Sequence, residues 1–230
     1  MIFSPTTIKN SILPVVFIFF TMISLILLTI SLVDTWYEIK LPSNGYFYKF
    51  NLYRYYEYSP GVFSSAYYYD IIKKNGFEKT KHLQLFVVEA ILQYFCFFSF
   101  IALVIAIYYS YKKNESRNLN LAIVFSSLLS LFQLTSILLL VGLPSAFKSS
   151  NFHCGSDNWC TALNGSRDGA QWKIRGGYNF AIAQLVLSMV CLATLIIRYK
   201  LDDRADTKQP NKDNQVDLIE SSKPNPINMF

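Results

Sequence analysis

The chain has 230 residues, of which 52% are hydrophobic and 17% aromatic, and its formal net charge is +6 at pH 7. Its apolar residues are gathered in long blocks rather than spread at core-forming intervals, which excludes an ordinary soluble domain. The basic residues flank these blocks and form no aromatic-interleaved module on a soluble domain, so the positive charge does not indicate nucleic-acid binding.

Four blocks are long enough to cross a bilayer, whose core of about 30 Å needs roughly 20 consecutive apolar residues. The first and third blocks carry no charged residue, and the second carries only Glu89. The sequence therefore predicts an all-α transmembrane fold, a four-helix membrane bundle with a small β-rich extracellular region. The predicted spans are 11–33, 83–110, 121–143 and 178–198.

The first block has a second interpretation, because a short polar stretch with Lys9 precedes it, as in a cleaved signal peptide. Its apolar run of about 22 residues exceeds the usual signal core of 7–15 residues. Residues 29–34 also lack a small-x-small cleavage pattern. We therefore expect this block to remain as the first span.

Charge and cysteine placement predict which side of the membrane each segment occupies. The link 111–120 is short and basic, and Arg198 and Lys200 follow the last block, which favours the cytoplasm for both. The segment 34–82 is also rich in lysine, so charge alone is a weak guide here. The cysteines of segment 144–177 suit an oxidising compartment and place that segment outside.

An even number of spans then puts both termini in the cytoplasm, as an N-terminal segment 1–10 and a disordered tail 199–230. The outer segments are 34–82 and 144–177. The acceptor sequence Asn164-Gly165-Ser166 is expected to carry a glycan.

The first outer segment, 34–82, is crowded with aromatic residues and predicts a hairpin. Residues 36–41 and 46–53 favour strands, and Asn44-Gly45 between them is a strong turn signal. Residues 64–74 predict a short helix that ends near Gly76.

Two interpretations of the aromatic residues remain open. They can form the core of an outer sheet and an interfacial belt, or they can form a protein-binding surface, since tyrosine and tryptophan give large contact areas. The candidates for contact are Trp36, Tyr46, Tyr48, Tyr53 and Trp159.

The second outer segment, 144–177, contains a plausible disulfide between Cys154 and Cys160, which enclose five residues. Redox pairs usually have two intervening residues, and His153 is the sole nearby imidazole, so a redox or zinc role lacks support. Residues 171–175 predict one more edge strand, and Asp168-Gly169 is a turn signal.

The predicted spans contain a few polar side chains in the half nearer the outer segments. Glu89 lies one helical turn from Gln93, and by helix rise Gln133 and Gln184 fall at a similar depth. These residues can form a polar layer of interhelical hydrogen bonds, or Glu89 can serve a cation or proton site in a channel or transporter.

The architecture resembles the claudin and peripheral myelin protein superfamily, with four spans, a β-rich first outer segment, a short basic link and a smaller second outer segment. Trp36 follows the first span, as a tryptophan does in that family. The family's Gly-Leu-Trp run and its cysteine pair in the first outer segment are absent here. The resemblance implies a left-handed bundle with an outer sheet that engages neighbouring proteins, laterally or across a cell contact.

We therefore expect a non-enzymatic four-pass glycoprotein of the plasma membrane or another secretory-route membrane. It would act in cell contact, membrane organisation or partner association through its outer segments, with the lipid bilayer and another membrane protein or a second copy as partners, and without a cofactor or bound metal. The alternative is a small channel, a transporter or an auxiliary channel subunit with Glu89 near the pathway. The spans and links hold no catalytic constellation that would indicate an enzyme.

Overall fold

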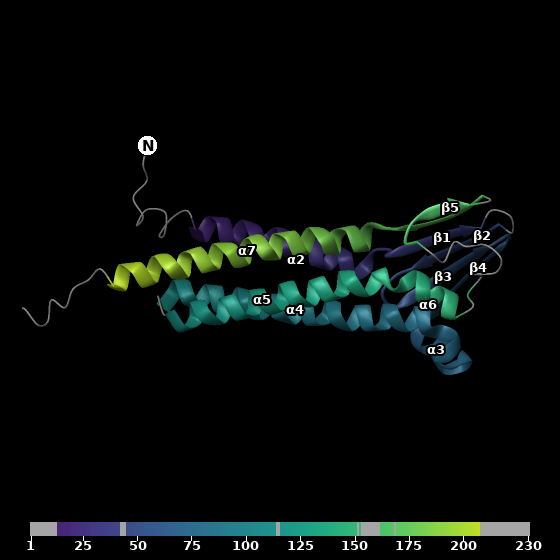
Figure 1. Ribbon diagram of the computed structural model, residues 1–230, viewed down its shortest axis with the longest axis horizontal. Coiled ribbons are helices and arrows are strands. Elements are labelled where there is room, and N and C mark those ends of the chain that lie inside the picture. Colours follow the sequence, from purple (N-terminus) through teal and green to yellow (C-terminus); the bar gives the residue numbers. More distant parts are fainter. Residues whose placement is uncertain are drawn as a thin grey trace, which may run out of the picture.

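The computed structural model describes residues 13–41, 45–113, 116–150, 152, 162–167 and 169–207 (Figure 1). Its long helices are α2 (Leu13–Val33), α4 (Lys81–Lys113), α5 (Ser116–Val141) and α7 (Gly176–Thr207). All four are long and apolar enough to cross a membrane, which confirms the helical part of the predicted fold class. They are the helices of a multi-pass membrane protein.

The long helices form an elongated bundle in which α2 lies beside α7 and α4 lies beside α5, while α5 also packs on α7 (Figure 1). Small residues allow the close α5–α7 approach: the hydroxyls of Ser130 and Ser188 lie 2.9 Å apart in the buried interface. Large apolar side chains such as Phe19 and Val186 lie on the outside of the bundle and are at least 60% exposed. Such a surface suits contact with lipid.

A six-stranded antiparallel sheet caps one end of the bundle (Figure 1). Its order is β4-β3-β2-β1-β6-β5, so two segments distant in sequence meet where β1 pairs with β6. The strands are β1 (Tyr37–Leu41), β2 (Tyr46–Phe50), β3 (Arg54–Ser59), β4 (Val62–Tyr67), β5 (Gly165–Arg167) and β6 (Ala170–Ile174). The small antiparallel sheet beside the helices bears out the β-rich region in outline.

The predicted hairpin corresponds to β1 and β2, which pair in the register Leu41↔Tyr46. Gly45 has φ 67°, a value that glycine adopts without steric cost. Residues 42–44 of the turn lie outside the described residues.

Two local predictions need correction. Residues 64–67 complete β4, so the expected helix begins only at α3 (Tyr68–Asn75), although it does end at Gly76. Antiparallel pairing of β4 with β3, from Arg54↔Tyr67 to Ser59↔Val62, holds this stretch in a strand instead. Strand β6 is also not at the sheet edge, because the short β5 pairs with its second side.

One face of the sheet, the packed face, lies on the end of the bundle together with α6 (Leu143–Ser149). Phe50 on β2 lies 5.4 Å from the Phe86 ring of α4 and 5.6 Å from the Phe147 ring of α6. Tyr37 and Tyr48 on the same face are at most 2% exposed. Residues 78–80 form a 3₁₀ turn, η2, that leads into α4. The sheet and the helices therefore share one aromatic core.

Trp36 fixes the corner at which α2 and α7 leave the bundle for the sheet. Its Nε1 donates a hydrogen bond to the Ser31 carbonyl at 2.6 Å, and its own carbonyl accepts from Arg175 N at 2.9 Å. A Cβ atom at Gly177 would overlap the Trp36 indole, so the ring packs directly on the α7 backbone. This contact orients both the first and the last long helix relative to β1.

Candidate functional site

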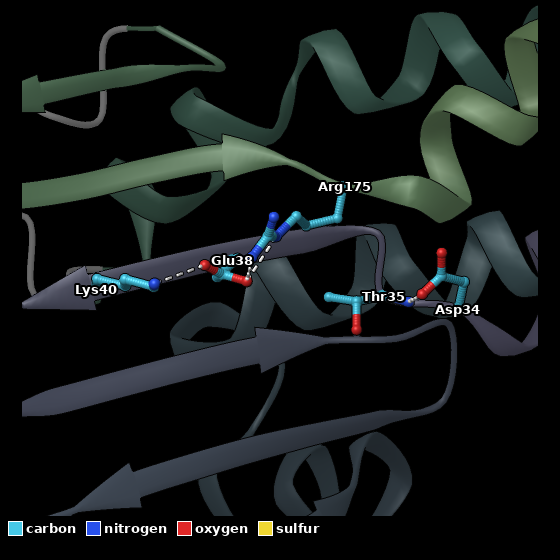
Figure 2. A network of polar contacts seen from close by, with 5 residues as sticks. All are labelled: Asp34, Thr35, Glu38, Lys40 and Arg175. Atoms are coloured by element: carbon cyan, nitrogen blue, oxygen red, sulfur yellow. Dashed lines mark hydrogen bonds and ion pairs between the residues drawn. The ribbon is translucent and has the colours of Figure 1, made fainter.

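The sheet face opposite the packed face carries the strongest candidate site. Pairs such as Lys49↔Tyr56 and Glu38↔Lys173 place those side chains away from the helices, which lie behind the strands in Figure 2. We call this surface the open face. Its strand residues are Glu38, Lys40, Phe47, Lys49, Arg54, Tyr56, Tyr58, Phe63, Ser65, Tyr67, Ser166, Gln171 and Lys173.

Aromatic rings and lysines interleave in the middle of the open face. The ring centroids of Phe47 and Tyr58 lie 5.3 Å apart, and those of Tyr58 and Phe63 lie 4.9 Å apart. Lys40 Nζ and Lys49 Nζ each lie 5.2 Å from the Phe47 centroid, within reach of a cation–π attraction. We call these five residues the open-face cluster.

The open-face cluster reaches the edge strand β4, which is uncharged and mostly exposed. Val62 is 61% exposed and Phe63 is 59% exposed, and β4 contains no charged residue. Edge strands usually carry charges, prolines or bulges that prevent unwanted pairing. An exposed, uncharged strand beside aromatic rings is therefore typical of a surface that contacts another molecule.

The charge of the open face is predominantly positive. Its strand cations are Lys40, Lys49, Arg54 and Lys173, whereas Glu38 is its one carboxylate among the described strand residues. Glu38 is 1% exposed, so it contributes little negative charge at the surface. The arrangement favours a partner whose surface is acidic, because opposite charges raise the association rate and align the partner.

Figure 2 shows the basic side chains that pair with the buried carboxylate of Glu38. Arg175 Nε donates to Glu38 Oε2 at 2.6 Å, Arg175 Nη2 also contacts this oxygen, and Lys40 Nζ lies 3.6 Å from Oε1. A buried carboxylate needs such partners because removal from water is costly. The ion pair joins residues 137 positions apart in sequence and therefore clamps β1 to the end of β6.

A polar cavity of about 270 Å³ opens beside this ion pair, at the end of the open face nearest the bundle. Asp34 and Lys49 line it together with Glu38 and Arg175. The Asp34 carboxylate accepts a hydrogen bond from Thr35 N at 2.7 Å, as Figure 2 shows. No three His, Cys, Asp or Glu side chains gather as metal ligands among the described residues.

The contact candidates from the sequence lie mostly on the packed side. Trp36 is 0% exposed and Tyr48 is 2% exposed, while Tyr46 and Tyr53 are half-buried. Tyr53 also donates its hydroxyl to the Leu32 carbonyl at 2.5 Å. Trp159 lies outside the described residues. The structure thus keeps the aromatic-rich strands but presents different members, Phe47, Tyr58 and Phe63, on the open face.

The alternation within residues 46–50 could have divided the residues of β2 between the two faces of the sheet. Tyr46, Tyr48 and Phe50 lie on one side of β2, and Phe47 and Lys49 lie on the other. The sequence does not reveal which side meets the helices, because both sides are aromatic.

The predicted polar layer is buried in the bundle but does not form one connected network. Glu89, Gln93, Gln133 and Gln184 are each 0% exposed. Ser136 donates to Glu89 Oε1, and Gln93 Nε2 donates to Ser136 Oγ at 2.7 Å. These bonds join α4 to α5.

The other two glutamines lie at the α5–α7 contact. Gln133 Nε2 donates to the Ala181 carbonyl of α7 at 3.1 Å, whereas the Gln184 amide finds no hydrogen-bond partner among the described residues. Sequence reasoning missed Ser136, the residue that bridges Glu89 and Gln93. Ser136 follows Gln133 by three residues, which places both on one face of α5, and this spacing was the signal in the sequence.

The structure describes only some of the remaining predicted site residues. Cys154 and Cys160 lie outside the described residues, and the described cysteines, Cys96 and Cys191, are free thiols buried in the bundle. Asn164 is exposed next to β5, and its Oδ1 accepts a hydrogen bond from Ile174 N at 2.7 Å. Its amide nitrogen, the atom to which a glycan is attached, is not used in that bond.

No protein-family model and no curated protein matches the sequence.

Proposed function

We propose that this chain is a non-enzymatic four-pass membrane protein that binds another membrane protein, or a second copy of itself, through the open face. The observation that carries the proposal is the open-face cluster, in which aromatic rings and lysines interleave on a sheet whose other face is already packed. Phe63 is exposed, and Phe47 and Tyr58 are half-buried. Aromatic residues are enriched in protein interfaces because they bury large areas at low conformational cost.

The proposal includes a membrane orientation in which the sheet faces outside and both termini are cytoplasmic. The exposed acceptor Asn164 lies at the sheet end of the bundle, while Lys112, Arg198 and Lys200 lie at the far end. The positive-inside rule and the glycan acceptor favour the same orientation. A role in cell contact or membrane organisation follows if the sheet extends from the cell surface.

Photo-crosslinking on live cells tests the proposal. A benzophenone amino acid at position 63 should give discrete protein adducts, identified by mass spectrometry. The same group at position 69 is the matched control, because Tyr69 is 72% exposed but lies on α3 rather than on the sheet. Equal adduct yields at the two positions, or none at position 63, would contradict binding through the open face.

A charge-reversal variant gives a second test with the same readout. Lys49→Glu should abolish the adducts from position 63, because it removes both cation–π contacts of this lysine and reverses the local charge. Lys74→Glu on α3 is an equivalent reversal at an exposed position off the sheet and should leave the adducts unchanged.

A second candidate function is ion or proton conduction with Glu89 near the pathway. One observation favours it: Glu89 Oε2 has no hydrogen-bond partner among the described residues although the side chain is 0% exposed. A lone carboxylate at this depth is a reason to consider transport. The hydrogen bonds through Ser136 also account for the residue as a link between α4 and α5.

A further inference from the structure

An apolar groove runs between α2 and α4 at the end of the bundle remote from the sheet. Its volume is about 310 Å³, and it is lined by Phe17, Ile18, Thr21, Met22, Val104, Ile107, Tyr108 and Tyr111. The groove exists because α2 packs mainly on α7 and touches α4 only lightly (Figure 1). From Val104 to Tyr111 it extends about 10 Å along α4, at 1.5 Å per residue.

Positive charge is concentrated where the groove reaches the helix ends. Lys112 Nζ lies 5.8 Å from the Tyr108 ring centroid, and the Arg198 guanidinium lies 4.0 Å from that of Tyr111. Arg198 is 3% exposed, so its charge is held behind the Tyr111 ring, whereas Lys112 is exposed. The groove therefore passes from a largely apolar trough to a cationic rim within about two helical turns.

We propose that this groove binds one anionic glycerophospholipid, with an acyl chain against Phe17 and Val104 and the phosphate beside Lys112 and the Tyr108 and Tyr111 rings. Apolar walls alone would accept any lipid chain. The cationic rim distinguishes an anionic headgroup from a zwitterionic one, as basic pockets between membrane helices do on the cytoplasmic side. This site is at the opposite end of the bundle from the open face and does not depend on the function proposed for it.

Lipid retention measures this preference directly. The full-length protein is purified in mild detergent from vesicles that contain equal amounts of phosphatidylserine and phosphatidylcholine with identical acyl chains. Mass spectrometry then gives the amount of each lipid retained per protein. The wild-type protein should retain phosphatidylserine in several-fold excess over phosphatidylcholine.

Two variants separate the rim from the trough. Lys112→Gln removes the exposed charge and should bring the two lipids to equal retention. Thr21→Phe fills the trough at a half-buried position on α2 and should lower the retention of both lipids several-fold. The matched control is Lys200→Gln, an exposed lysine at the same end on α7, which does not line the groove.

Equal retention of both lipids by the wild-type protein would overturn the proposal. The same holds for retention of phosphatidylserine that is undiminished in Thr21→Phe, since binding would then lie outside the groove. If Lys200→Gln lost as much of the phosphatidylserine preference as Lys112→Gln, the preference would come from general surface charge. That result would also overturn the proposal. The groove is supported as the site if Lys112→Gln loses the phosphatidylserine preference, Thr21→Phe loses retention of both lipids, and Lys200→Gln behaves as the wild-type protein does.

Discussion

Gly177 makes room for the Trp36 ring at the corner of this fold because glycine has no Cβ atom. The glycine lets the indole reach the α7 backbone while Nε1 remains bonded to the Ser31 carbonyl. Any larger residue at position 177 must displace the ring or the helix. Because β1 and α7 both start from this corner, a displacement there affects the sheet and the bundle together.

We expect Gly177→Ala to lower the free energy of unfolding by about 1–3 kcal/mol, the usual cost of overpacking. Trp36→Phe alone should also destabilise, because it removes the Nε1 bond and indole volume. The double variant should lose less than the sum of the two, since the smaller ring makes room for the new methyl group. Thermal unfolding followed by circular dichroism measures all three, and strictly additive losses would argue against direct contact.

The Glu38–Arg175 pair gives a second prediction for single residues. Arg175→Gln should destabilise by about 2 kcal/mol, because it leaves a buried carboxylate with Lys40 as its remaining ion-pair partner. Glu38→Gln together with Arg175→Gln should cost less than Arg175→Gln alone, since no buried charge remains. Lys173→Gln, on the same face but outside the pair, is the control for general charge loss. A double variant less stable than Arg175→Gln would contradict this account in thermal unfolding.

The buried tyrosines of the sheet predict that it loses stability at alkaline pH. Burial raises the pKa of Tyr37, and burial together with Glu57 raises the pKa of Tyr48 and Tyr55. Tyr55 donates its hydroxyl to Glu57, which requires the protonated phenol. Ionisation is therefore harder in the folded sheet than in the unfolded chain, whose tyrosines ionise at about pH 10.

The stability that these phenols contribute is fully present below about pH 10 and decreases as the pH rises further, because the unfolded state then releases protons that the folded state retains. We expect tyrosinate absorbance of the buried set to appear only together with loss of the sheet signal in circular dichroism. Tyr55→Phe and Tyr48→Phe should each move that transition to higher pH. A phenolate signal that develops while the sheet stays intact would show that these rings are accessible.

The β5–β6 hairpin allows a test that separates the predicted glycan from the stability of the fold. Ser166→Ala destroys the acceptor sequence but keeps the bond from Ile174 N to the Asn164 side chain, so it should abolish the glycosidase-sensitive gel shift at little cost in stability. Asn164→Ala should abolish the shift and also destabilise by about 1 kcal/mol through the lost hydrogen bond. A shift that persists in both variants would place the glycan elsewhere.

Elements were predictable to different degrees for physical reasons. Long apolar blocks identify α2, α4, α5 and α7 because length and composition suffice for a span. The hairpin of β1 and β2 was predictable because Gly45 and the flanking aromatic residues act locally. The place of β6 beside β1 was not, since pairing between segments so far apart leaves no local pattern. Nor could the helix at residues 64–67 be rejected before its pairing with β3 was known.

At the scale of the whole molecule, Glu89 separates the two candidate functions. In a contact protein, Glu89→Gln keeps an acceptor for Ser136 and should leave both the adducts from position 63 and the ion permeability of reconstituted vesicles unchanged. In a conductor, the same change would alter flux or its ion dependence. Ser136→Ala, which removes the hydroxyl shared by Glu89 and Gln93, is the control for loss of the α4–α5 link. A flux that falls in Glu89→Gln but not in Ser136→Ala would favour conduction.

The central pairing of β1 with β6 also sets an order of events during synthesis. When β1 to β4 have emerged, the β1 edge that carries Glu38 still lacks Arg175, and it stays so until residues 170–175 are translated. At typical translation speeds this interval is on the order of ten seconds. Until then β1 is an edge strand with unpaired backbone groups, and Lys40 is the remaining ion-pair partner of Glu38. A ribosome that stalls within α5 would therefore leave a chain whose sheet ends at the open edge of β1.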